Sequence, residues 1–464
     1  MSDTARPRRG ERESAAGPAG PAGRAPALRR RDVAPLAGAV GGALVFGAPP
    51  AAGARAAAAA SSARATLPNG LVVLVEERPT ADTVALQLTA RVGAREDGDR
   101  PGLGALTSRV MFQGTRRRPS ETDLQRAAAE VGGTLSRGTG AESSFFASRV
   151  PWGEAETAFD LLADLALEPA FEPGALERQQ QLALQDLARA RVDPGALLGD
   201  LFQAAMFAGH PVGTPVLGTP ESVGALTREA LLAHRERYWS GANLVLTAVG
   251  RLTADEALEA AARAFGPLPA GATYRRPTAP SRPPEAQVVR GQAGQQQAQV
   301  RVGFPAPRLT DDDRYPMTVL TALMGGRAGR LQRELRTARG LVYSTGPGYA
   351  GFTDAGAWYV AAAVEPRNLD PALEVVRAEV RRLREAPPEP EEVAKRITQV
   401  AGAQALADEG NDARAARLAN AEVLGTETQE EFLRRVRQVT PADVRRVAGA
   451  YLDPDRAVLV IVGP

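Results

Sequence analysis

Two stretches of the chain repeat each other at an offset of 213 residues. Residues 226–250 read LTREALLAHRERYWSGANLVLTAVG, and residues 439–463 read VTPADVRRVAGAYLDPDRAVLVIVG. In both copies a Thr is followed eleven residues later by a Tyr, and that Tyr twelve residues later by a Gly. Each copy predicts a helix capped by Thr, a turn and a buried strand ending at Gly, with Pro441 at the first helical position of the second copy. The matching spacings predict two tandem homologous domains.

The rest of the chain alternates between strand and helix signals. Residues 71–77 and 83–91 are rich in strand-forming residues, and the second stretch alternates with a period of two. Residues 155–167 and 176–191 carry apolar residues at helical spacing. Together with the length, the linker and the repeat, these signals fit two tandem α+β domains.

A linker separates the two predicted domains. Residues 273–284 read TYRRPTAPSRPP, with four Pro in twelve positions, a composition typical of a connecting segment. We therefore predict a first domain at 66–272 and a second domain at 285–464, each about 200 residues long, which suits the size of one folded unit.

The first 60 residues differ in composition from the rest. Residues 1–32 are polar and Arg-rich, residues 33–54 carry no charge, and a run of small residues follows. This order is expected of an export signal, so we expect residues 1–60 to be a leader and the mature protein to be periplasmic. A retained anchor and an unstructured Ala/Gly/Pro tail are the alternatives. No other stretch of about 20 apolar residues follows, which predicts a mature chain without a membrane span.

The charged and metal-binding residues exclude several kinds of site. Cys is absent and His occurs twice, which excludes a thiolate nucleophile, a Cys-ligated metal and a site with three His ligands. Residues 1–32 hold eight Arg and four acidic residues, so the remainder has a net charge of −2. The high isoelectric point therefore belongs to the leader, and we expect no nucleic-acid partner.

Four segments carry a resemblance to a known family. They are residues 102–115 (GLGALTSRVMFQGT), 159–176 (FDLLADLALEPAFEPGAL), 210–226 (HPVGTPVLGTPESVGAL) and 325–343 (GGRAGRLQRELRTARGLVY). In this order and spacing they resemble the insulinase/pitrilysin zinc peptidases, which include the mitochondrial processing peptidase. The resemblance implies two homologous α+β domains, each a mixed, mainly antiparallel sheet with helices packed on one side. Two such chains or linked halves close around a peptide.

The zinc motif of this family is degenerate here. The family places His-x-x-Glu-His on a helix, where the two His hold Zn²⁺ and the Glu is the general base. The corresponding residues are Ala105, Ser108 and Arg109. The family's third ligand, a later Glu, corresponds to Gln185 or Asp186. We therefore expect no metal and no intact catalytic site in this chain.

The two histidines lie outside the zinc motif. We expect His210 to occupy a structural turn and His234 to be exposed on the helix of the first repeat copy. A rearranged metal site around Asp186, Glu177 and one His is a weaker alternative, because these residues have no metal-ligand spacing.

The second-domain signature keeps two polar residues of the family. The resemblance implies that Arg336 and Tyr343 contact the substrate carbonyl near the zinc, and both side chains can donate to a developing oxyanion. Gly340 between them should end the helix. The alternative is that Arg336 is merely solvated and Tyr343 packs in a core. In the family a peptide also pairs with an edge strand of the first domain, here residues 135–139 (LSRGT), where the usual Asn-Ala is Ser-Arg.

These features lead to two main hypotheses. In the first, the chain is the non-catalytic subunit of a heterodimeric metallopeptidase that acts on peptides or unfolded proteins. An active insulinase-family partner would hold the zinc, and this chain would supply Arg336 and Tyr343. In the second, the chain is a peptide-binding or scaffold module without any hydrolytic role.

Overall fold

The computed structural model describes residues 62–280 and 284–463. The predicted leader and its cleavage region lie outside the described residues. None of the described linker residues 273–280 belongs to a helix or strand. No helix in the described ranges is long and apolar enough to cross a membrane.

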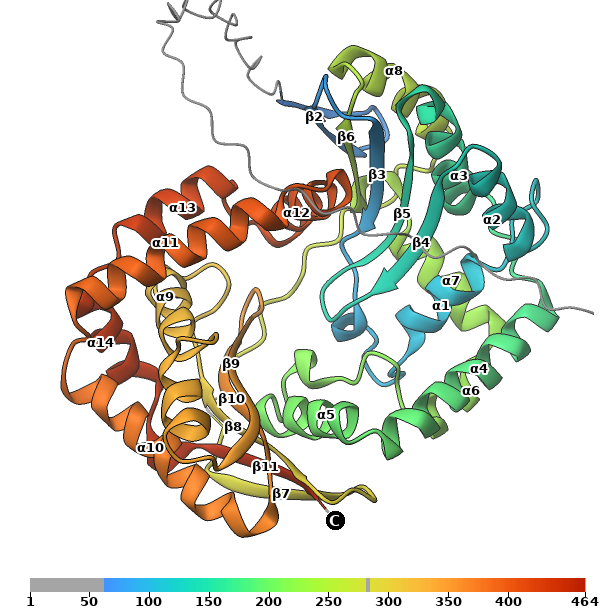
Figure 1. The fold of residues 1–464 in the computed structure, drawn as a ribbon. Helices are drawn as coiled ribbons and strands as arrows, with labels where there is room; N and C mark the ends of the chain where they lie inside the picture. The colour runs from blue at the N-terminus through green and yellow to red at the C-terminus, as the bar shows by residue number, and fades with distance from the viewer. Residues whose placement is uncertain (1–61, 281–283, 464) are drawn as a thin grey trace, which may run out of the picture. The chain divides into compact units, whose positions relative to one another are not determined.

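In the described part of the first half, six strands form one sheet in the order β1-β2-β6-β3-β5-β4 (Figure 1). Neighbouring strands are antiparallel, except that β2 and β6 are parallel. The strands are β1 (Ser62–Thr66), β2 (Val72–Glu77), β3 (Thr83–Ala90), β4 (Thr134–Thr139), β5 (Ser144–Pro151) and β6 (Leu244–Gly250).

The described second half builds a five-stranded sheet in the order β7-β11-β8-β10-β9. Its strands are β7 (Gln287–Gln292), β8 (Ala298–Pro305), β9 (Val342–Gly351), β10 (Gly356–Val364) and β11 (Val458–Gly463). The order matches β2-β6-β3-β5-β4 position for position, and the one parallel pair, β7 with β11, falls at the equivalent place. The predicted mixed, mainly antiparallel sheets in two homologous halves are therefore confirmed.

The repeated segment forms equivalent helices in the two halves. Helix α7 (Arg228–Tyr238) and helix α14 (Pro441–Tyr451) each begin after a Thr whose hydroxyl accepts the backbone N–H three residues later. Such a cap satisfies an N–H group that otherwise lacks an intrahelical partner. Each helix leads into a buried strand, as the sequence predicts, and that strand, β6 or β11, is a member of the parallel pair in its sheet.

The remaining helices surround the two sheets. The first half contains α1 (Leu103–Met111), α2 (Glu121–Glu130), α3 (Ala155–Leu167), α4 (Pro173–Val192), α5 (Pro194–Met206), α6 (Pro220–Ala225) and α8 (Ala254–Phe265). The second contains α9 (Arg314–Met324), α10 (Leu369–Glu385), α11 (Pro390–Ala407), α12 (Asn411–Leu424) and α13 (Gln429–Arg437).

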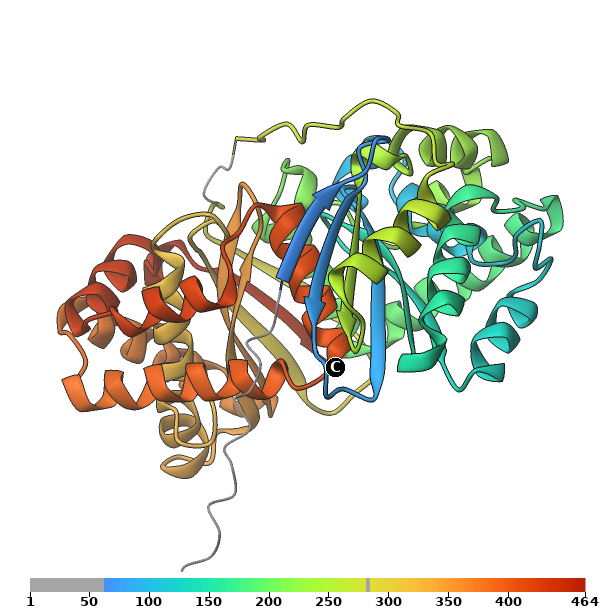
Figure 2. The same ribbon diagram turned by 90° about the horizontal axis from the view of Figure 1, so that it is seen from above.

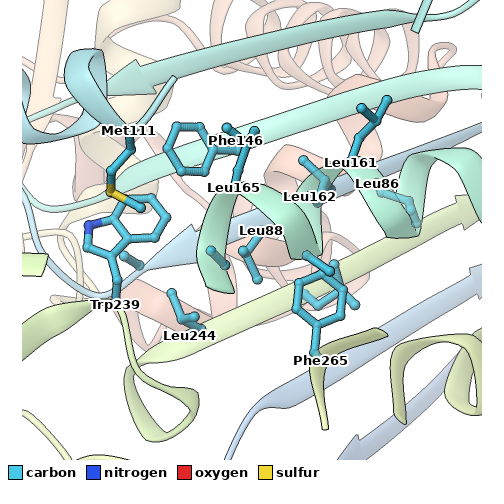
Figure 3. Packing of buried hydrophobic residues seen from close by; sticks show 14 of the residues in the cluster. Leu86, Leu88, Met111, Phe146, Leu161, Leu162, Leu165, Trp239, Leu244 and Phe265 are labelled. Carbon is cyan, nitrogen blue, oxygen red and sulfur yellow. The ribbon is translucent and has the colours of Figure 1, made fainter. Parts of the chain in front are cut away.

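Helices and strands of the first half enclose a large apolar core (Figure 3). Phe146 of β5 and Trp239, just after α7, have ring centroids 4.7 Å apart, and Met111 at the end of α1 is fully buried beside them. Leu161 and Leu165 of α3 belong to the same cluster. This core therefore fixes α1, the helix with the degenerate motif, against the first sheet.

Each half also contributes one helix to the sheet of the other half. Phe202 of α5 belongs to an apolar cluster with Val460 of β11. Reciprocally, Ala415 of α12 clusters with Ala85 of β3 and Val249 of β6, and Figure 2 shows α12 beside the strands of the first sheet. Helices α5 and α12 cover the face of each sheet that its own half leaves open. Each sheet therefore has a second helical cover besides the predicted layer on one side.

A buried ionic network also joins the two halves. Arg95 is 7% exposed and forms ion pairs with Glu142 and with Asp354, each at 2.6 Å. Asp354 lies in the turn between β9 and β10, and Glu142 lies between β4 and β5. Arg276 of the linker bonds Glu96 at 2.9 Å. Opening this contact would leave buried charges without partners, so it holds the halves together.

Candidate functional site

Two glycines and one acid fix the start of α1. Gly102 has a φ of +90°, and a side chain there would lie 2.9 Å from the carbonyl of Leu217. Gly218 in turn approaches the carbonyl of Pro101 so closely that a Cβ would lie 2.4 Å from it. The carboxylate of Asp97 accepts the N–H groups of Gly102 and Gly104, each at 2.9 Å. Two of the segments that carry the family resemblance therefore pack together here.

The zinc-motif positions on α1 are buried or paired. Ala105 is 6% exposed and Ser108 is 1% exposed, and the Ser108 hydroxyl has no hydrogen-bond partner among the described residues. Arg109 Nη2 lies 2.7 Å from Asp186 Oδ2 on α4. Gln185, the other candidate for the third ligand position, is exposed. An ion pair therefore joins Arg109, one of the expected motif positions on α1, to Asp186 in the region expected to hold the third ligand.

Arg336 and Tyr343 lie side by side at the surface of the second half. Arg336 lies in a short π-helix, Gln332–Thr337, and Tyr343 lies near the start of β9. The guanidinium carbon is 5.9 Å from the centroid of the Tyr343 ring, and Tyr343 is 70% exposed. Gly340 turns the chain between them with a φ of +62°. Tyr343 therefore does not pack in a core, and the alternative expectation for it is wrong.

The Arg336–Tyr343 pair and the zinc-motif positions on α1 are not bonded to each other. In the described part of the chain, no hydrogen bond or ion pair joins the Arg336 and Tyr343 side chains to Ala105, Ser108 or Arg109. The structure thus brings Arg336 to Tyr343 and Arg109 to Asp186 as two separate pairs, and the substrate-binding role of the first pair stays a prediction.

Both halves of the chain match models of one peptidase family. Residues 72–220 match the family described as "Insulinase (Peptidase family M16)", and residues 225–400 match "Peptidase M16 inactive domain". An uncharacterised zinc protease of Streptomyces coelicolor is 31% identical over 417 residues, which cover 86% of this chain and 89% of that protein. The chain belongs to the insulinase family, M16.

Solved structures show the same M16 fold. A peptidase M16 inactive domain from Pseudomonas fluorescens superposes with a TM-score of 0.80 at 20% identity, covering 87% of this chain and 98% of that one. A chain of complex III2 from Candida albicans superposes with a TM-score of 0.74 at 20% identity, covering 86% of this chain and 95% of that one. At these identities the likeness concerns the fold.

The residues at the M16 zinc position do not fit zinc. A methyl group, an unpartnered hydroxyl and a guanidinium stand where two imidazoles and a general base are needed, and the guanidinium is a permanent cation. The described residues contain no group of three or more His, Asp or Glu side chains that could hold a metal. Asp186 is bonded to Arg109 and lies 3.3 Å from Arg189, so it is already neutralised by cations.

The two histidines have structural surroundings. His210 lies in a turn, as expected, where its Nδ1 accepts the N–H of Val212 at 3.2 Å and its Nε2 lies 3.4 Å from Asp354. Burial lowers the pKa of His210, although Asp354 opposes this effect.

The expectation that His234 is exposed is wrong. Its side chain is 4% exposed on the inner face of α7, with the Tyr238 ring at 4.9 Å, and burial lowers its pKa to about 4. The helical spacing of Leu231, His234 and Tyr238 is the signal that could have indicated this inner face.

Arg137 is a site residue whose role the sequence did not indicate. It lies on β4, an edge strand of the first sheet, within the segment expected to pair with peptides. Its guanidinium carbon is 5.7 Å from the ring centroid of Phe112, the residue that follows α1. Burial lowers the pKa of Arg137, and the positive charge of Arg109 lowers it further. The carboxylates of Glu121 and Asp186 oppose this lowering, so Arg137 lies among charges of both signs.

Proposed function

We propose that this chain is a non-catalytic subunit of a heterodimeric M16 metallopeptidase. An active partner with an intact His-x-x-Glu-His helix would bind the metal and cleave the substrate, a peptide or unfolded protein. This chain would close the chamber and present Arg336 and Tyr343 to the bound peptide. We further propose that both subunits are exported to the periplasm.

The proposal rests on a difference between two sites: the zinc-motif positions on α1 have lost the family's residues, whereas Arg336 and Tyr343 are kept. Arg109, which corresponds to a zinc ligand in the family motif, is paired with Asp186 at 2.7 Å, and this supports a chain unsuited to bind the metal. In contrast, the Arg336 and Tyr343 side chains lie next to each other and are open to solvent. At such an exposed position neither side chain is needed to pack the fold. An exposed pair of hydrogen-bond donors is more readily explained by a ligand than by stability.

The chemistry of the exposed pair suits a peptide carbonyl. A guanidinium and a phenol both donate hydrogen bonds at neutral pH, and both could bind an oxygen that gains negative charge during cleavage. Donors held in place before the reaction stabilise such a charge without reorganising. Since the Arg336 side chain stacks near the Tyr343 ring, each helps to orient the other.

The test combines identification of the partner with kinetics. Affinity purification of this chain from its native cells, followed by mass spectrometry, should recover an M16 chain with an intact His-x-x-Glu-His motif. In the reconstituted pair, Tyr343→Phe and Arg336→Ala should each lower peptide turnover by about a hundredfold, the effect of losing one oxyanion donor.

A nearby arginine provides the matched control. Arg339 is also exposed, but its guanidinium pairs with Glu334 at 2.6 Å. Arg339→Ala should therefore leave turnover unchanged, and thermal melts of all three variants should match the parent. Full activity of both Tyr343→Phe and Arg336→Ala would refute the subunit hypothesis.

The scaffold function is the second candidate. The fold likeness to a chain of complex III2 is the observation that favours it. In that case the purified assembly would contain no chain with the intact zinc motif, and no peptide hydrolysis would accompany it.

A further inference from the structure

Arg137 is a partly buried cation without a counter-ion. Leu135, Arg137 and Thr139 alternate along β4 and so share one face of the sheet, and Leu135 belongs to the main core. Arg137 therefore projects toward the helix layer, where its guanidinium meets the Phe112 ring. Among the described residues it forms no hydrogen bond and no ion pair, although it is only partly exposed.

Neither nearby carboxylate forms an ion pair with Arg137, although Glu121 and Asp186 both favour its charged form. Asp186 makes its short contact to Arg109 at 2.7 Å, and Glu121 accepts a hydrogen bond from Gln113 at 2.6 Å. A desolvated guanidinium is unfavourable unless an anion pairs with it. The cluster of Arg109, Arg137, Arg189, Asp186 and Glu121 thus keeps one positive charge in excess.

The free edge of β4 lies beside this charge. Within the described sheet β4 pairs with β5 alone, so the outer row of its backbone N–H and C=O groups can accept another strand. A peptide added there would carry its side chains past Arg137.

We propose that the former zinc position is a carboxylate-binding site, in which Arg137 pairs with an acidic group of a peptide added to the β4 edge. One uncompensated guanidinium matches one carboxylate, which can accept two parallel N–H bonds from it. The backbone edge supplies affinity for any extended chain, and Arg137 supplies the preference for acid. The site lies in this chain alone and needs no catalytic partner.

The test compares three labelled five-residue peptides by fluorescence anisotropy with the purified chain. The first is Ala-Val-Glu-Val-Ala with an amidated C-terminus, the second replaces Glu by Gln, and the third is the Gln peptide with a free C-terminal carboxylate. At least one carboxylate-bearing peptide should bind about tenfold more tightly than the neutral one, as expected for a hydrogen-bonded ion pair. The tighter peptide identifies the source as a side chain or a chain terminus.

Variants assign the preference to Arg137. Arg137→Gln should abolish the tenfold preference without lowering the melting temperature, because it removes a charge that has no partner. Asp186→Asn should increase the preference, because it releases Arg109 as a second cation. Arg126→Gln is the control for net charge, since Arg126 is 60% exposed on α2 and pairs with Asp123.

Two results would overturn the proposal. One is equal binding, or no binding, of all three peptides to the parent chain. The other is a preference that survives Arg137→Gln. Neither result bears on Arg336 and Tyr343, so this site and the proposed subunit function fail or succeed separately.

Discussion

Restoring the zinc motif tests how completely the half-site has been replaced. The variant carries Ala105→His, Ser108→Glu and Arg109→His on α1, so that two imidazoles four residues apart lie on one helical face. Arg109→His also releases the Asp186 carboxylate, which the ion pair now holds 2.7 Å from the guanidinium. Two imidazoles and one carboxylate form a zinc-binding set, so we expect the variant to bind Zn²⁺.

The burial of α1 sets the magnitude. Ala105 and Ser108 are 6% and 1% exposed, so larger side chains there should lower stability by about 1–3 kcal/mol each. Losing the Arg109–Asp186 pair adds about 1 kcal/mol at most, because the Asp186 side chain is one-third exposed. The metal-free variant should therefore be about 2–7 kcal/mol less stable than the parent and still partly folded. Zinc at a hundred times its dissociation constant should restore about 2.7 kcal/mol.

The assay is thermal melting with zinc and with a chelator, alongside elemental analysis of zinc after mild chelation. The parent chain should melt identically under both conditions and hold far less than one zinc per chain. The triple variant should melt higher with zinc. A matched control adds Asp186→Asn to the triple variant and should lose most of that increase. Stoichiometric zinc in the parent, or a triple variant indifferent to zinc, would refute the reasoning.

Four further predictions address stability and processing. Ser108→Ala should keep or raise the unfolding free energy, by up to about 1 kcal/mol, because it removes a buried hydroxyl without a partner; a clear loss in urea unfolding would contradict this. Arg95→Met should lower it by about 3–5 kcal/mol, because Asp354 and a second buried carboxylate lose their cation; a change below 1 kcal/mol would argue against the network. The low pKa of His234 means that the unfolded chain binds a proton at a higher pH, so stability should fall by about 3 kcal/mol from pH 6.5 to about 4. His234→Phe should reduce that fall, as melts across this pH range would record. Intact mass of the native protein should show the loss of most of residues 1–60, and a mature chain beginning at the first residue would disprove export by this signal.

The helices and strands could be predicted largely from local sequence. The predicted helix at 155–167 coincides with α3, and the predicted strand at 71–77 contains β2. The predicted Thr caps of α7 and α14 are both present. Such features depend on residues within a few positions of each other, and local hydrogen bonds and side-chain periodicity decide them.

The candidate site could be predicted only in part. Residue identity alone removes metal ligands at Ala105, Ser108 and Arg109, whatever surrounds them. The sequence left Gln185 and Asp186 as equal candidates, and the packing of α4 on α1 selects Asp186 as the partner of Arg109. The burial of His234 likewise depends on which face of α7 packs against the rest of its half.

By itself the sequence determined that this protein has two homologous α+β halves and lacks the His-x-x-Glu-His residues of its family, because repeat spacing and residue identity do not depend on distant contacts. Only the tertiary structure decided that α5 and α12 cross to the opposite sheets and that Arg109 binds Asp186 while Arg137 forms no ion pair among the described residues. Those outcomes join residues from tens to hundreds of positions apart in the chain. Complementary apolar surfaces and charges select such partners during packing, and no local pattern records which segment will meet which.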